Sequence, residues 1–178
     1  MTSSMVFVRP DFWLASDCRR IRAAMDSGAA MPAEIYADDY RVDEDARRAF
    51  EVEVGDDVIN EVQHAIGRIR QEIAEFFGIA LRGDEGPGFL RYSIGGFYRR
   101  HLDVSPEWDE RFPRRISVVV FLTSAGEQCG GGSLRMYVPR LCEIVPRAGT
   151  LVAFPSNVPH EVLLVTEGIR DVVVDWFY

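Results

Sequence analysis

The stretch PRAGTLVAFPSNVPHEVLLVTEGIRDVVVDWF, residues 146–177, decides the fold. It holds three runs rich in valine, leucine and phenylalanine, which are separated by prolines and glycines that favour turns. The same rhythm extends back to Phe89, and the predicted strands are 89–94, 97–102, 116–123, 133–138, 141–145, 150–154, 160–166 and 170–177. Short strands in this number after a helical lead-in predict an α+β, mainly β chain in the form of a jelly roll, and argue against a parallel βαβ sheet.

Residues 1–88 are expected to support this core mainly with helices. Helical segments are predicted at 16–27, capped by Ser16, near 44–50, and at 56–77, capped by Asp56. The longest of them carries one apolar stripe with steps of four and three residues, formed by Val62, Ile66, Ile69, Ile73 and Phe76. That helix is therefore expected to lie flat against a sheet, with His64 off the stripe and on the surface.

Length and composition fit one compact domain over residues 1–178, in which 89–178 form the jelly-roll core. No stretch approaches the roughly 18 consecutive apolar residues of a membrane span, and the N-terminus lacks the basic start and apolar run of a secretory signal. Cys18, Cys129 and Cys142 are widely spaced and form no C-x-x-C pair, which favours reduced thiols. The expected location is the cytoplasm.

The net charge of −8 disfavours a nucleic-acid partner, because phosphate binding draws on lysine and arginine. Several arginines nevertheless gather in one part of the sequence, at Arg99, Arg100, Arg111, Arg114 and Arg115. They form either a solvated face or a surface that recognises an anionic or carboxylate-bearing substrate. The sequence leaves both interpretations open.

Two of the three histidines lie in the strand-rich half, one of them beside a carboxylate. His101 and Asp103 are two residues apart, so on a strand their side chains leave the same face. His160 follows Pro159 at the start of another predicted strand. Two imidazoles and one carboxylate form the facial triad of non-haem Fe(II) oxygenases, which leaves positions open for a 2-oxo acid and O2. Unrelated core or surface residues would give the same pattern, so this motif alone does not decide the function.

Arg170 adds a second chemical group to the pattern. It follows His160 by ten residues, and the turn at 166–168 predicts a hairpin that brings its strand back alongside that of His160. An arginine inside an apolar barrel requires an anion, and the distal carboxylate of 2-oxoglutarate would supply one through a bidentate contact. The alternative is a surface arginine on a strand.

These pieces together resemble a known family. Residues 89–178 are similar to the prolyl-4-hydroxylase branch of the 2-oxoglutarate/Fe(II) dioxygenase superfamily, especially to oxygen-sensing prolyl hydroxylases and their bacterial relatives. The matching segments are RYSIGGFYRRHLD (91–103), RRISVVVFLT (114–123), GGGSLRMY (130–137), PRAGTLVAFPSNVPHEV (146–162) and GIRDVVVDWF (168–177). The first ninety residues carry no comparable signature.

The resemblance implies a double-stranded β-helix with iron at one mouth. It makes His101, Asp103 and His160 the metal ligands and Arg170 the partner of the C5 carboxylate of 2-oxoglutarate. Tyr92 corresponds to a tyrosine that hydrogen-bonds this cosubstrate, and otherwise would be a core tyrosine. The implied cofactors are Fe(II), 2-oxoglutarate as cosubstrate and O2, with ascorbate as a candidate reductant that keeps the iron in the Fe(II) state.

The resemblance also implies substrate contacts from Tyr98, Arg115 and Trp176, although Arg115 would otherwise belong to the solvated arginines and Trp176 to the core. Trp176 lies an even number of residues from Arg170, so both side chains should leave the same face of their strand. Tyr98 lies an odd number from His101, so it should point away unless the strand is broken near Gly95-Gly96. Leu122 occupies the expected place of a tyrosine that holds the C5 carboxylate in close relatives.

The function that the resemblance implies is hydroxylation of a C–H bond with release of succinate and CO2. Asp103 disfavours halogenation, because halogenating relatives have a small residue there. The substrate could be a prolyl residue, an amino acid or another small metabolite, under a short lid near 102–113, and the oligomeric state is open. Alternatives are a cupin-type metalloenzyme that does not use 2-oxoglutarate and a non-catalytic binding module on the same fold. A nucleic-acid demethylase is disfavoured by the acidic balance.

Overall fold

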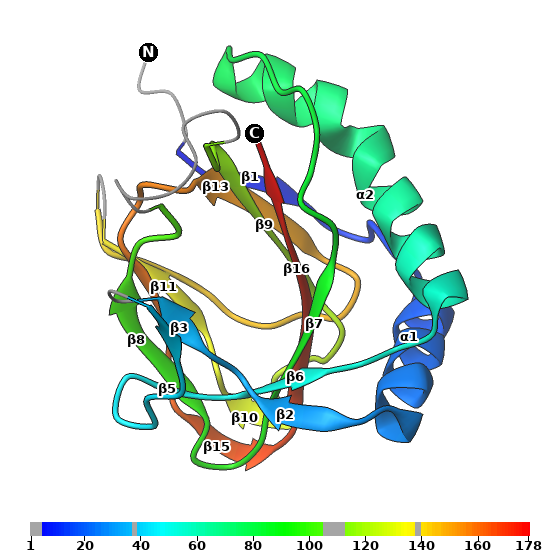
Figure 1. The fold of residues 1–178 in the computed structure, drawn as a ribbon, viewed down its shortest axis with the longest axis vertical. Helices are drawn as coiled ribbons and strands as arrows, with labels where there is room; N and C mark the ends of the chain where they lie inside the picture. Colours follow the sequence, from blue (N-terminus) through cyan, green and yellow to red (C-terminus); the bar gives the residue numbers. More distant parts are fainter. Residues whose placement is uncertain (1–4, 37–38, 105–112, 138–139) are drawn as a thin grey trace.

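In the computed structural model, which describes residues 5–36, 39–104, 113–137 and 140–178, two β-sheets face each other and helices cover the outside of one of them (Figure 1). The large sheet has the strand order β1-β13-β9-β16-β7-β6-β2, and the small sheet has the order β12-β11-β14-β8-β5. Neighbouring strands in both sheets pair antiparallel. This is the mainly β jelly roll that the sequence predicts.

The strand bounds locate each element in the chain. The large sheet contains β1 (Phe7–Arg9), β2 (Ala30–Pro32), β6 (Phe50–Val52), β7 (Gly88–Tyr92), β9 (Ile116–Phe121), β13 (Leu151–Pro155) and β16 (Arg170–Phe177). The small sheet contains β5 (Arg47–Arg48), β8 (Phe97–His101), β11 (Leu134–Met136), β12 (Cys142–Ile144) and β14 (His160–Val162). Two further pairs are β3 (Ile35–Tyr36) with β4 (Tyr40–Arg41), and β10 (Cys129–Gly131) with β15 (Val165–Gly168).

Two helices, α1 (Ala15–Ser27) and α2 (Asp56–Phe77), pack on the outer face of the large sheet (Figure 1). The apolar stripe predicted for α2 is buried in the core between the helices and the large sheet, called the helix-side core below. Phe76 is the exception, because it is 40% exposed and its ring packs edge-to-face with that of Phe7. His64 is exposed, as expected. Neither helix in the described ranges is long and apolar enough to cross a membrane.

The N-cap of each helix lies one or two residues before the predicted cap. The N-cap of α1 is Leu14, whose backbone N–H donates to Asp17 Oδ2 at 3.0 Å, so Ser16 lies inside the helix. The N-cap of α2 is Gly55. An acidic side chain in the first turn therefore satisfies the start of α1 in place of a serine cap.

The space between the two sheets holds a second core, which surrounds the functional cavity. Its large buried members come from both sheets and include Leu90, Phe121, Leu134, Val152, Phe154 and Val162. Alternation along β9 divides the two cores, because Phe121 faces the small sheet and Val120 faces the helices. Each central strand of the large sheet is thus covered on both faces.

Residues 1–88 do more than support the core with helices. The segment 44–50 is not helical, because Arg47 and Arg48 pair with Tyr98 and Phe97 of β8, and Phe50 begins a strand that pairs with β7. Strands β1, β2 and β6 extend the large sheet. Pairing with an existing sheet edge overrides the weak helical preference of this segment.

The hairpin predicted between 160–166 and 170–177 is also wrong. The first of these segments divides into β14, which joins the small sheet, and β15, which pairs with β10. Strand β16 instead lies in the large sheet between β7 and β9. The turn near Gly168 therefore carries the chain from one sheet towards the other, and both Arg170 and His160 line the space between the sheets.

Candidate metal centre

His101, Asp103 and His160 meet between the sheets near the end of β8. Strand β14 pairs with β8 so that His160 stands directly opposite His101, and Asp103 follows two residues after β8. The Nε2 atom of His101 lies 3.4 Å from Asp103 Oδ1, and the Nε2 atom of His160 lies 3.5 Å from Asp103 Oδ2. One possible ligand atom from each residue lies within 4.8 Å of those of the other two, so a single metal ion could contact all three.

Backbone carbonyls orient both imidazoles for metal binding. His101 Nδ1 lies 2.8 Å from the carbonyl oxygen of Arg99, and His160 Nδ1 lies 2.9 Å from that of Val158. A carbonyl oxygen only accepts, so each Nδ1 carries the hydrogen and each Nε2 offers its lone pair to the centre. Burial lowers the pKa of His160, which favours the neutral form that binds metals. This donor set fits Fe(II).

The carboxylate of Asp103 is held by two hydrogen bonds on one side. Its Oδ2 accepts from Ser117 Oγ at 2.7 Å and from the indole Nε1 of Trp176 at 3.0 Å. Burial alone would raise the pKa of Asp103, but the neighbouring His160 and His101 hold that pKa well below its usual range. The carboxylate therefore stays ionised.

Tyr98 faces the metal centre because β8 carries a bulge. A step of two residues on β14, from His160 to Val162, stands opposite a step of three on β8, from His101 back to Tyr98. The tyrosine ring stacks on the His101 ring with centroids 3.5 Å apart, and burial raises the pKa of Tyr98 to about 12. The break needed for this orientation lies within β8, after the Gly95-Gly96 pair that the sequence singled out.

Arg170 lies deep in the same cavity with an unpaired donor. It stands opposite Tyr92 in the β7–β16 pairing and is 1% exposed, and burial lowers the pKa of its guanidinium. Its Nε donates to the carbonyl oxygen of Gly132 at 2.7 Å, whereas its buried Nη1 has no partner among the described residues. A buried cation with a free donor is the feature that a carboxylate ligand would complete.

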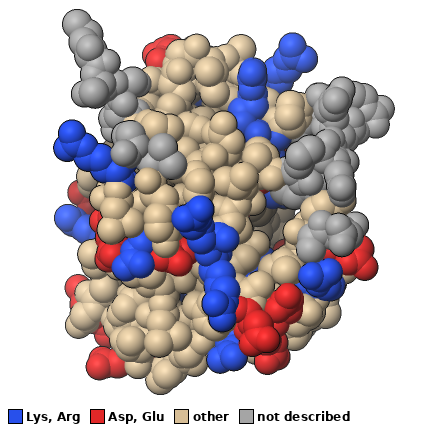
Figure 2. Space-filling model, turned by 90° about the vertical axis from the view of Figure 1, so that its left-hand side faces the viewer, with Lys and Arg blue, Asp and Glu red and all other residues tan. Residues whose placement is uncertain are grey.

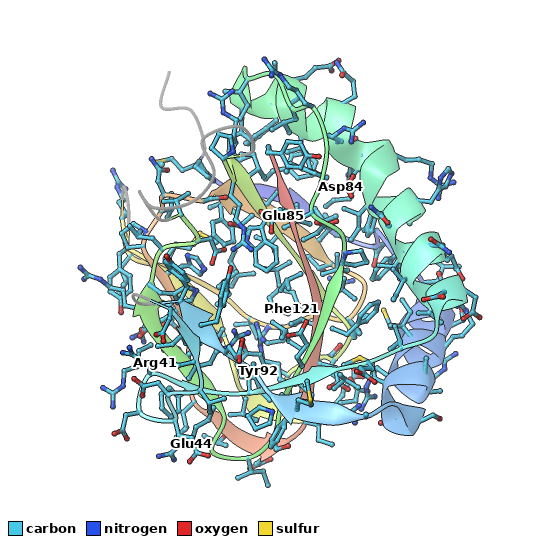
Figure 3. All side chains as sticks on the ribbon, in the orientation of Figure 1. Arg41, Glu44, Asp84, Glu85, Tyr92 and Phe121 are labelled. Carbon is cyan, nitrogen blue, oxygen red and sulfur yellow. The ribbon has the colours of Figure 1, made fainter. Side chains whose placement is uncertain are left out.

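Two aromatic rings flank the Arg170 guanidinium. Its Cζ lies 4.9 Å from the Tyr92 ring centroid and 5.4 Å from that of Phe121, and Figure 3 shows both rings inside the barrel. The resemblance placed Leu122 at the position of a tyrosine that would lie near this arginine, but Leu122 packs in the helix-side core. The expectation was wrong by one residue, and on a strand one residue reverses the face.

A cavity of about 500 Å³ connects the metal centre with Arg170. The predicted site residues on its wall are Tyr92, Tyr98, His101, Asp103, His160, Arg170 and Trp176. Arg115 is exposed and is not among the lining residues described, whereas its neighbour Arg114 lines the cavity. The Cζ atom of Arg114 lies 3.7 Å from the centroid of the Trp176 ring. The same guanidinium donates two hydrogen bonds to the carboxylate of Glu85.

The arginine cluster of the sequence divides into separate environments. Arg99 and Arg100 are exposed on the outside of β8, where they lie over the rings of Phe97 and Tyr137. Figure 2, which looks from the side of the small sheet, shows arginines and acidic residues mixed on this face. Arg111 and most of the predicted lid at 102–113 lie outside the described residues. The outer arginines therefore form a solvated face, and Arg114 belongs to the cavity.

Sequence reasoning missed the part of the cavity wall that comes from the first ninety residues. These lining residues are Glu34, Ile35, Tyr36, Tyr40, Arg47 and Glu51. Arg47 is the best connected of them, because its Nη1 donates to the carbonyl oxygen of Glu34 and its Cζ lies 4.7 Å from the Tyr98 ring. No sequence motif marks this segment, in which the rings of Tyr36 and Tyr40 contact each other.

Comparison with known proteins agrees with this geometry. The sequence pattern of the 2OG-Fe(II) oxygenase superfamily matches residues 87–178. A PKHD-type hydroxylase of Rippkaea orientalis is 36% identical over 90 residues, which are 49% of this chain and 40% of that protein. The match thus spans about two-fifths of that relative's length.

Solved structures extend the similarity to nearly the whole chain. A prolyl-4-hydroxylase of Pseudomonas putida is 27% identical with a TM-score of 0.75, over 97% of this chain and 91% of that chain. A prolyl hydroxylase of Trichoplax adhaerens, solved with a peptide fragment of hypoxia inducible factor, shares the fold with a TM-score of 0.80 at 20% identity, over 99% of this chain and 84% of that one. With the family pattern matching half of its length, the chain belongs to the 2OG-Fe(II) oxygenase superfamily.

Proposed function

We propose that this chain is an Fe(II)- and 2-oxoglutarate-dependent dioxygenase that hydroxylates a C–H bond of its substrate. One observation carries the proposal: the buried Nη1 of Arg170, which has no hydrogen-bond partner in the described part of the chain, shares a cavity with the His101, Asp103 and His160 triad. A metal triad alone would fit several chemistries. The arginine adds a place for a carboxylate that reaches from the metal into the barrel.

In this function His101, Asp103 and His160 would hold Fe(II), and Arg170 would bind the C5 carboxylate of 2-oxoglutarate. When bound, iron with 2-oxoglutarate and O2 supplies the oxidation, in which one oxygen atom enters succinate and the other enters the substrate as a hydroxyl, with release of CO2. The protein orients both molecules and keeps the oxidation away from water.

Several residues perform this orientation and exclusion. The backbone carbonyls behind His101 and His160 fix the two Nε2 atoms towards the centre. Apolar side chains from both sheets line the cavity and exclude water along the cosubstrate, namely Leu90, Val119, Leu134, Val162 and Val172. The neutral phenol of Tyr98 covers one face of His101.

A prolyl residue of a peptide is the favoured substrate, with an amino acid or another small metabolite as the alternatives. The support is the similarity to the Pseudomonas putida prolyl-4-hydroxylase over most of both chains. The Trichoplax adhaerens protein, which binds a peptide, shares the fold. We further propose that the protein acts in the cytoplasm as one domain, in line with its three free cysteines.

A cupin-type metalloenzyme and a binding module remain the competing functions. A cupin that uses no 2-oxoglutarate would give the buried Arg170 no anion, which is costly for a buried guanidinium. A binding module would not need three oriented donors of the kind that hold a reactive metal.

The test is conversion of 2-oxoglutarate to succinate by purified protein loaded with Fe(II). Slow succinate formation is expected even without substrate, with stimulation by peptides that contain proline. His160→Ala should abolish it, whereas Arg115→Ala, which changes an exposed arginine, should not. If metal-loaded protein neither binds 2-oxoglutarate nor forms succinate, the proposal fails in favour of the two competing functions.

A further inference from the structure

Gly132, between β10 and β11, makes an unusually close contact with Arg170. Its carbonyl oxygen accepts the Nε–H of Arg170 at 2.7 Å, and its own N–H donates to the carbonyl oxygen of Leu164 at 3.1 Å. A Cβ atom built on Gly132 would lie 2.7 Å from Arg170 Cδ and 3.2 Å from Val165 Cγ2. The backbone φ is +69°, which also disfavours other residues. No other residue type fits here without displacing the arginine.

This contact determines which guanidinium donors remain available. Because the carbonyl of Gly132 takes the Nε–H, that edge of the guanidinium cannot serve a ligand. The rings of Tyr92 and Phe121 restrict the guanidinium on its flanks but accept no conventional hydrogen bond from its edge. The Nη1 group, which has no partner among the described residues, is left for an anion.

We propose that Gly132 is a positioning residue for the dicarboxylate cosubstrate. It sets the direction of Arg170 in two ways: its carbonyl holds Nε, and its missing side chain leaves the room that Cδ occupies. The affinity for 2-oxoglutarate then depends on Gly132 although Gly132 does not touch the cosubstrate. The inference deepens the proposed function and rests on it for the identity of the ligand.

The first experiment compares two glycine variants by their binding of 2-oxoglutarate in the presence of Mn(II). Gly132→Ala should raise the Kd for 2-oxoglutarate about tenfold or more, because the displaced arginine loses part of a charged hydrogen bond. The Kd for Mn(II) should stay within about twofold, since no metal ligand touches Gly132. Gly126→Ala is the matched control, because Gly126 has φ +82° but nothing within 4 Å of an added Cβ. Equal effects of the two variants on 2-oxoglutarate, or none from Gly132→Ala, would overturn the proposal.

A second experiment keeps the proposal testable if Gly132→Ala folds poorly or if the ligand is another anion. Thermal unfolding is measured for wild type, Gly132→Ala, Arg170→Ala and the double variant. If Gly132 acts through Arg170, Gly132→Ala lowers Tm much less in the Arg170→Ala background, where Cδ is absent. Additive losses of Tm would refute the coupling. Should wild type bind no 2-oxoglutarate at all, the proposed function fails while this cycle still decides on the role of Gly132.

Discussion

At the scale of single residues, the two oxygens of Asp103 have different surroundings. Each oxygen faces one imidazole Nε2, that of His101 for Oδ1 and that of His160 for Oδ2, but Oδ2 also accepts hydrogen bonds from Ser117 and Trp176. An oxygen that already accepts two hydrogen bonds has less electron density to give to a metal. We therefore expect Asp103 to bind through Oδ1 alone, which keeps a coordination position free for the cosubstrate and O2.

Trp176→Phe tests this role of the indole N–H. The variant keeps an aromatic ring under Arg114 but removes the donor to Asp103. Loss of such a supporting hydrogen bond should weaken metal affinity about 10-fold or more, measured as the Kd for Mn(II) by competition with a chelating dye. Trp13→Phe, which is far from Asp103 in the helix-side core, is the control. If metal affinity is unchanged and only substrate-dependent turnover falls, Trp176 is the substrate contact that the sequence suggested.

Arg170→Ala separates the cosubstrate site from the metal site. The variant removes a buried charged donor but no metal ligand, so the KM for 2-oxoglutarate should rise by about 30-fold or more while the Kd for iron stays within about twofold. His101→Ala should instead weaken iron binding itself. Similar loss of iron in both variants would mean that Arg170 is only structural.

At the scale of elements, β16 presents opposite chemistry on its two faces. Arg170 and Trp176 point into the cavity, while Asp171 and Asp175 are buried on the helix side. Asp171 is neutralised by Arg91, which donates to both of its oxygens, and by Arg22. The carboxyl of Asp175 has no such cation, and its Oδ2 lacks a partner among the described residues.

Asp175 should therefore make stability depend on pH. Burial, with the nearby charge of Asp84, raises its pKa from 3.8 to about 7. Between these values the folded state holds a proton that the unfolded state has released, so stability falls as pH rises from about 4 to about 7. The expected size is a few kcal/mol at most. Tm of wild type and Asp175→Asn is measured from pH 5 to 8: the fall should be smaller in the variant, and parallel curves would contradict the assignment.

Sequence reasoning located elements whose signal is local. The run 170–177 became β16 with the same bounds, and even spacing correctly put Arg170 and Trp176 on one face. Alternation along the strand put Tyr98 on the wrong face, because the bulge in β8 depends on how β8 pairs with β14, and no local sequence pattern shows that pairing. The same holds for 44–50, where the partner strand decides the conformation.

Register errors had a comparable origin at two cavity positions. Leu122 lies one residue from Phe121, which faces the space between the sheets beside Arg170, and Arg115 lies one residue from Arg114, which lines the cavity. Phe121 and Leu122 are both apolar and the strand is covered on both faces, so hydrophobicity does not distinguish the inner face from the outer. Arg114 and Arg115 are the same residue type just before β9, so residue type does not distinguish them either. The three residues of the triad were correctly predicted to lie together, because histidine and aspartate differ in chemistry from the apolar residues of the neighbouring strands.

At the scale of the whole molecule, the site is assembled from both sheets. His101 and His160 come from the small sheet, while Ser117, Arg170 and Trp176 come from the large one. The three metal ligands come together in the folded state only, and one of them, Asp103, accepts hydrogen bonds from Ser117 and Trp176 of the large sheet. Bound metal should therefore stabilise the whole fold.

Mn(II) at about 100 times its Kd should raise Tm by roughly 5–10 °C, the equivalent of about 2.7 kcal/mol. Addition of a chelator should reverse the shift. His160→Ala should show almost none of it, and His64→Ala, which changes an exposed histidine on α2, should retain all of it. An equal shift in the His160→Ala variant would mean that the metal binds elsewhere.

The central claim is that one cavity binds iron through the triad and 2-oxoglutarate through Arg170. Its most direct test is anaerobic addition of Fe(II) and then 2-oxoglutarate, followed by the weak visible charge-transfer absorption of the chelate. Wild type should develop the band and saturate, Arg170→Ala should need about 30-fold or more additional 2-oxoglutarate for the same band, and His160→Ala should lack it. Iron-loaded wild type that develops no band at saturating 2-oxoglutarate would contradict the account.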